Sequence, residues 1–132
     1  MKIFVLIITV LTFASCASNK TVSDIQAIRF GSGGGFTGEI KKYQLSPEGE
    51  LSTISDQDTI LYKKISKASV RDIMMSAEAI KSLELNEPEN MYRFIEIDYN
   101  KSSTYKLVWG LGYKDLPAQV DSLYNSLTGL LK

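Results

Sequence analysis

The hydrophobic pattern of this chain changes period after residue 64, and this change constrains the fold more than any other feature. Before it, apolar and polar residues alternate in short segments that are separated by turn residues. Alternation with period two is typical of strands, and turns at this spacing indicate an antiparallel meander. The pattern predicts strands at residues 25–30, 36–45, 50–54 and 59–64.

The segment after residue 64 has the 3.6-residue spacing of a helix. Its apolar positions are Val70, Ile73, Met74, Ala77, Ile80 and Leu83. Ser69 and Asp72 resemble a capping box at its start, and the polar residues 86–90 end it. We therefore expect one amphipathic helix in the middle of the chain.

The C-terminal part has a similar order. Residues 92–99 and 104–109 alternate around a polar turn and predict a second hairpin. Asp115 is placed to cap a final helix with Pro117 in its first turn. The apolar stripe of that helix is Leu116, Val120, Leu123, Tyr124, Leu127 and Leu131.

These segments together predict an α+β fold of order β-β-β-β-α-β-β-α. A mostly antiparallel sheet with both helices packed on one face is the simplest arrangement of such elements. The chain contains no internal repeat and no low-complexity linker, so residues 24–132 are expected to form a single domain.

The N-terminal residues are expected to direct the chain to a membrane rather than to form part of the domain. Lys2 is followed by an apolar run and then by Ala14, Ser15 and Cys16, which is the only cysteine. This order resembles the lipobox of bacterial lipoproteins, so residues 1–15 are expected to be a signal peptide. The resemblance implies that Cys16 is lipidated and that acyl chains anchor the mature protein in a membrane.

The residues after Cys16 predict the tether and the location. Residues 16–23 are small and polar and are expected to link the lipid to the domain. By resemblance to lipoprotein sorting patterns, Ala17 implies the outer membrane, with the domain facing the periplasm.

Composition narrows the chemistry that this chain can perform. It contains no histidine, which excludes Ser-His-Asp and Cys-His catalysis and histidine-ligated zinc and copper sites. Lys and Arg together number 15, as do Asp and Glu, so there is no basic footprint for nucleic acid. We expect no cofactor, no metal site and no nucleic-acid partner.

A glycine cluster at residues 31–35 is the main candidate functional feature. Residues 33–38 formally match the G-x-G-x-x-G dinucleotide motif, but that motif needs a helix directly after it, and a strand pattern follows here. Two interpretations remain: a flexible or bulged connection, or a loop whose exposed N–H groups contact a ligand or partner. The candidate binding residues are Gly33, Gly34, Gly35, Phe36, Thr37 and Trp109, with Trp109 placed at the rim if the two segments meet.

Two other groups of residues have both structural and functional interpretations. Glu96 and Asp98 lie on one face of a predicted strand, as a solvated strand face or as the paired carboxylates of a glycosidase or calcium site. Aromatic residues gather around the second hairpin, where they either pack in the core or form a binding surface. They are Tyr92, Phe94, Tyr99, Tyr105, Trp109 and Tyr113.

The run from Ile28 to Gly38, followed by Tyr43-Gln44-Leu45 and Glu48-Gly49-Glu50-Leu51, is similar to small bacterial lipoproteins with no assigned activity. The resemblance implies a strand, a Gly-rich loop, a second strand, a turn and a helix, and it supplies no catalytic residues.

Three functions are therefore weighed. The first is a non-enzymatic binding module with a protein or another envelope component as partner. The second is an inhibitor of a secreted or periplasmic enzyme that inserts the glycine loop into its target. The third is a histidine-free hydrolase that uses carboxylates.

Overall fold

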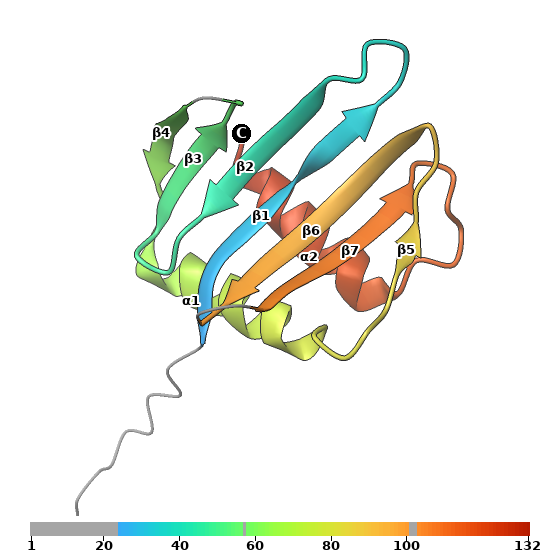
Figure 1. Cartoon of the computed structure of the whole chain (residues 1–132). Coiled ribbons are helices and arrows are strands. Elements are labelled where there is room, and N and C mark those ends of the chain that lie inside the picture. Colours follow the sequence, from blue (N-terminus) through green and yellow to red (C-terminus); the bar gives the residue numbers. More distant parts are fainter. Residues whose placement is uncertain (1–23, 57, 101–102) are drawn as a thin grey trace, which may run out of the picture.

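The computed structural model describes residues 24–56, 58–100 and 103–132, which form one sheet and two helices (Figure 1). The predicted signal peptide, Cys16 and the tether lie outside the described residues. Within these ranges, no helix has the length and apolar character needed to cross a membrane. The elements are β1 (Ile25–Gly34), β2 (Ile40–Leu45), β3 (Glu50–Ile54), β4 (Thr59–Lys64), α1 (Lys67–Ala79), β5 (Asn86–Glu87), β6 (Met91–Tyr99), β7 (Ser103–Gly110) and α2 (Ala118–Gly129).

The sheet has seven strands in the order β4-β3-β2-β1-β6-β7-β5. Neighbouring strands are antiparallel, except that β5 and β7 pair in parallel. The meander β1–β4 and the hairpin β6–β7 meet along β1 and β6, so the first strand of the sequence lies at the centre of the sheet. The predicted α+β class with a mostly antiparallel sheet is confirmed.

Both helices cover the same face of the sheet (Figure 1). The apolar side chains of this face and the apolar stripes of the helices form one buried cluster, in which each large aliphatic or Phe side chain contributes about 1.5–3 kcal/mol by leaving water. The cluster includes Ile28, Phe30, Leu45, Ile95, Ile97 and Leu107 from the sheet, and Val70, Ile73, Ala77, Val120, Leu123 and Leu127 from the helices. This packing fixes α2 against the sheet.

The ends of α1 differ from the prediction. Ser66 is the N-cap, because its hydroxyl accepts a hydrogen bond from the backbone N–H of Ser69 at 3.3 Å. The helix ends at Ala79, well before residues 86–90. The chain turns away early because Leu85 is buried and its carbonyl accepts a hydrogen bond from Val108 N at 2.9 Å, which leads into β5.

The predicted cap of α2 is also wrong. Pro117 occupies the N-cap position, and no side chain caps the helix. The carbonyl of Pro117 instead accepts the backbone N–H groups of Val120 and Asp121 at 3.0 and 3.1 Å. Asp115 therefore lies in the loop before the helix.

The glycine cluster, predicted as a loop, lies largely within β1. Gly33 pairs with Ile40 of β2, and Gly34 pairs with Met91 of β6. The strand predicted at residues 36–45 begins only at Ile40. Residues 35–39 form the β1–β2 connection, which we call the hairpin tip.

Candidate functional site

Two glycines of β1 accommodate aromatic rings from the neighbouring strand. Gly31 lies opposite Phe94 and Gly33 opposite Tyr92 in the register of β1 and β6. A Cβ atom at Gly31 would lie 3.1 Å from Phe94 Cζ and would overlap the carbonyl of Lys41; one at Gly33 would lie 2.9 Å from Tyr92 Oη. These glycines are therefore needed for close packing within a strand.

The hairpin tip depends on glycine for its backbone conformation. Gly34, Gly35 and Gly38 have φ angles of 92°, 79° and 65°, which L residues with a side chain rarely adopt. The N–H of Gly35 donates to the carbonyl of Asn90 at 2.8 Å, which attaches the base of the tip to the residue directly before β6. Phe36, at the tip, is fully exposed.

Trp109 does not belong to this surface, contrary to the prediction. Its side chain is only 2% exposed and belongs to the core beneath α2. The indole packs edge-on against Tyr124, with ring centroids 5.2 Å apart. The reason is register: Trp109 lies opposite Arg93, on the sheet face that the helices cover. Trp109 thus supports α2 from below.

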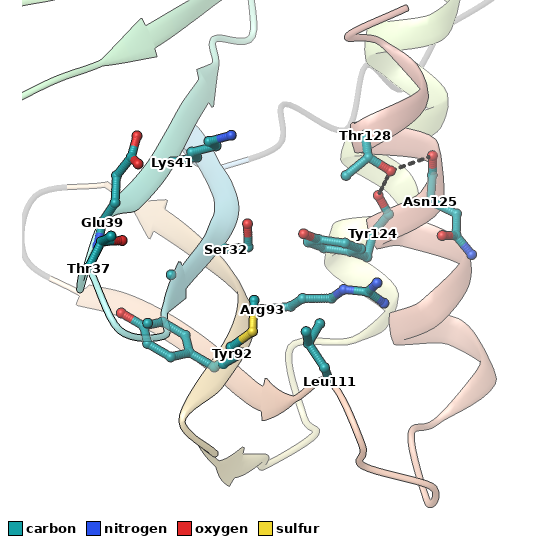
Figure 2. Close-up of a pocket in the computed structure, with 13 residues that line it drawn as sticks. Ser32, Thr37, Glu39, Lys41, Tyr92, Arg93, Leu111, Tyr124, Asn125 and Thr128 are labelled. Atoms are coloured by element: carbon teal, nitrogen blue, oxygen red, sulfur yellow. Dashed lines mark hydrogen bonds between the residues drawn. The ribbon is translucent and has the colours of Figure 1, made fainter.

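A cleft of about 510 Å³ opens between α2 and the adjoining ends of β1, β2 and β6 (Figure 2). Three of the predicted binding residues, Gly33, Gly34 and Thr37, line it, whereas Phe36 lies outside it. The other lining residues are Ser32, Glu39, Lys41, Met91, Tyr92, Arg93, Leu111, Tyr124, Asn125 and Thr128.

Three of these residues form a row across the sheet. Lys41 of β2 and Arg93 of β6 both lie opposite Ser32 of the central strand, so the three side chains share one face. The guanidinium of Arg93 lies 5.4 Å from the centre of the Tyr124 ring. Neither Lys41 nor Arg93 forms an ion pair with any residue in the described ranges.

The two hydroxyls of α2 that line the cleft already donate hydrogen bonds within the protein. Tyr124 donates to the carbonyl of Gly31 at 3.0 Å. Thr128 donates to the carbonyl of Tyr124 at 2.9 Å, as Figure 2 shows. Burial raises the pKa of Tyr124, although the positive charge of Arg93 opposes this in part. Tyr124 is therefore neutral at pH 7, and its hydroxyl links α2 to Gly31 of β1.

Glu96 and Asp98 lie on the opposite, helix-free face of the sheet. Arg29 forms ion pairs with both, at 2.7 Å to Glu96 Oε1, and Lys42 and Lys106 lie 3.9 and 3.8 Å from the Glu96 carboxylate. Burial acts to lower the pKa of Arg29, but its hydrogen bonds to Asp98 and Glu96 outweigh this and raise it.

A second hollow, of about 890 Å³, lies on the helix-free face beside the ion pairs of Arg29 with Glu96 and Asp98. Lys42 and Lys106 line it and flank the Phe94 ring, with their ammonium groups 5.9 and 5.6 Å from the ring centre. Both lysines also lie within 4 Å of the Glu96 carboxylate, so each has a partner of opposite charge. Lys41 and Arg93 have no such partner among the described residues, which makes the cleft beside α2 the better candidate site.

Sequence reasoning did not identify Lys41, Arg93 and Tyr124 as neighbours. A signal was present, since Lys41 alternates in step with Tyr43 and Leu45, which point toward the core. A cation at a core-facing position near a strand end is unusual and indicates a polar cavity. Among the described residues, no group of three or more potential metal ligands occurs. The chain matches no known protein family, and no curated protein is significantly similar to it.

Proposed function

We propose that this chain is a non-enzymatic binding module, anchored by lipid at Cys16 in the outer membrane and facing the periplasm. Its hairpin tip contacts a protein or another component of the envelope. The observation that carries this proposal is Phe36, a large apolar side chain held fully exposed at the end of a hydrogen-bonded hairpin. Exposing such a ring to water is unfavourable, and burying it in a partner recovers the hydrophobic free energy.

The direction of β1 supports this function. Ile25 and Gly34 lie at opposite ends of the strand, which spans about 30 Å at roughly 3.3 Å per residue. A lipid anchor that precedes residue 24 therefore attaches at the end of the sheet remote from the hairpin tip (Figure 1). The tip is then the part of the domain best placed to meet a partner away from the membrane.

The carboxylates fit a structural role better than a catalytic one. Glu96 and Asp98 both form ion pairs with Arg29, so their oxygens are engaged within the protein rather than free to face a substrate. The hydrolase hypothesis therefore has less support than the binding hypothesis.

The test is a crosslinking pulldown from intact cells that keep the lipidated protein in its own membrane. We expect Phe36→Ala to lose a specific envelope partner that the wild type captures. The matched control is Met75→Ala, which removes another exposed apolar side chain from α1. A partner list that Phe36→Ala leaves unchanged contradicts the proposal.

An enzyme inhibitor is the second candidate function. The hairpin tip projects beyond the neighbouring end of β6 (Figure 1), and the hydrogen bond from Gly35 to Asn90 fixes its base. A projecting, fixed loop is suited to insertion into an active-site cleft. If the captured partner is an enzyme, the purified protein is expected to lower its activity, and Phe36→Ala to restore it.

A further inference from the structure

We propose that the cleft beside α2 is an oxyanion site, which binds the phosphate or carboxylate group of a small solute between Arg93 and Lys41. This goes beyond the contact proposed for Phe36 and does not depend on it, because Phe36 does not line the cleft.

The first support is the spacing of the two cations. Lys41, Ser32 and Arg93 occupy paired positions on three adjacent strands, so the outer two backbones are roughly 10 Å apart at 4.7–4.9 Å per strand. Side chains that rise from both outer strands on one face leave a space of molecular size above Ser32. An oxyanion in that space accepts hydrogen bonds from both sides.

The second support is the state of Arg93. The Arg93 side chain is partly buried, and its guanidinium lies 5.4 Å from the centre of the Tyr124 ring, which is a cation–π contact rather than a hydrogen bond. No side-chain hydrogen bond from Arg93 occurs within the described ranges. A planar fork of donors that is partly removed from water is best satisfied by a carboxylate or phosphate.

The remaining polar groups define the site further. The hydroxyls of Tyr124 and Thr128 donate to backbone carbonyls. The hydroxyl of Ser32 lies between the two cations in the strand register and is placed to assist them. The only carboxylate that lines the cleft belongs to Glu39, and its side chain points away from α2 (Figure 2). The charge that faces an entering ligand is therefore positive.

The test is isothermal titration calorimetry on the full chain in detergent at low salt, with inorganic phosphate in one arm and acetate in the other. We expect binding in at least one arm, and the arm that binds assigns the ligand class. Arg93→Gln and Lys41→Gln are each expected to weaken binding by about tenfold or more, as for a lost charge-assisted hydrogen bond. Arg71→Gln on α1, which removes an exposed arginine remote from the cleft, is expected to change nothing.

Three results overturn the site. They are binding in neither arm, unchanged binding in Lys41→Gln, and equal weakening in Arg71→Gln, which indicates net charge alone. If Arg93→Gln does not fold because Tyr124 loses its neighbour, the exposed Lys41 decides the outcome. Phe36→Ala is expected to bind the anion normally, so the failure of one proposal is distinguishable from the failure of the other.

Discussion

Gly31 illustrates how a single missing side chain organises the middle of the sheet. Its carbonyl accepts the hydroxyl of Tyr124 from α2, while the space where its Cβ would stand is taken by Phe94 and by the backbone of Lys41. Gly31 thus takes part in packing on both faces of the sheet. A side chain at this position has to displace main-chain atoms of β2.

We therefore expect Gly31→Ala to lower the free energy of unfolding by about 1–3 kcal/mol or more, as overpacking against backbone does. The control is Gly129→Ala, where a Cβ meets nothing within 4 Å and alanine favours the helix by up to about 1 kcal/mol. Urea denaturation measures both. Similar losses in the two variants would mean that the close approach at Gly31 has no energetic consequence.

At the scale of elements, Trp109 connects β7 to α2, whereas Phe36 contacts nothing comparable. Although both were candidates for one surface, they are expected to behave in opposite ways. Trp109→Ala should cost about 3–5 kcal/mol, as for other large buried aromatic residues, and should loosen α2. Phe36→Ala should change stability by less than about 0.5 kcal/mol. Thermal unfolding followed by circular dichroism compares them, and a large loss in Phe36→Ala contradicts the assignment of the tip as a free surface.

The elements that the sequence predicts best are those bounded by local chemistry. The bounds of β3 and β4 match the prediction, because the turn with Pro47 and Gly49 and the polar turn after Ile54 are encoded by the residues themselves. In contrast, β5 is a two-residue parallel strand, which is too short to carry a period. Local sequence signals thus predict the long strands and the helices, but not a short strand such as β5.

The candidate site was less predictable, since it depends on which strands pair. Nothing local indicates that β6 adds to the free edge of β1, yet that pairing places Arg93 beside Ser32 and buries Trp109 under α2. The glycine cluster at residues 31–35 is visible in the sequence. Its role in packing is not, because the rings of Phe94 and Tyr92 that pack on it come from a strand that is distant in the sequence.

At the scale of the whole molecule, three tyrosines make stability sensitive to alkaline pH. Burial raises the pKa of Tyr99, Tyr105 and Tyr124 above 10.0. As pH rises past about 10, the unfolded chain loses these protons before the folded one, so deprotonation lowers the free energy of the unfolded state relative to that of the folded state. The contribution of these groups to the free energy of unfolding is therefore expected to be constant below about pH 9 and to fall above pH 10.

Urea denaturation between pH 7 and 11 tests this dependence. Tyr124→Phe is expected to start from lower stability, because the bond to Gly31 is lost, but to decline less steeply above pH 10. Met75→Ala, which removes an exposed side chain that carries no titratable group, is expected to decline as the wild type does. Parallel alkaline declines for Tyr124→Phe and the wild type would assign the effect to other groups.

The central position of β1 also has a mechanical consequence if the proposed lipid anchor holds the chain at its N-terminus. If a partner held at the hairpin tip pulls against the anchor, the tension enters near Ile25 and leaves near Gly34, along one extended strand. A strand is already close to the full contour length of its backbone, so it has almost no slack to release. Single-molecule stretching between Ile25 and Gly34 is expected to give little extension before the contact with the partner breaks. The load therefore runs through the same strand that contributes Ile28 and Phe30 to the core and Ser32 to the cleft beside α2.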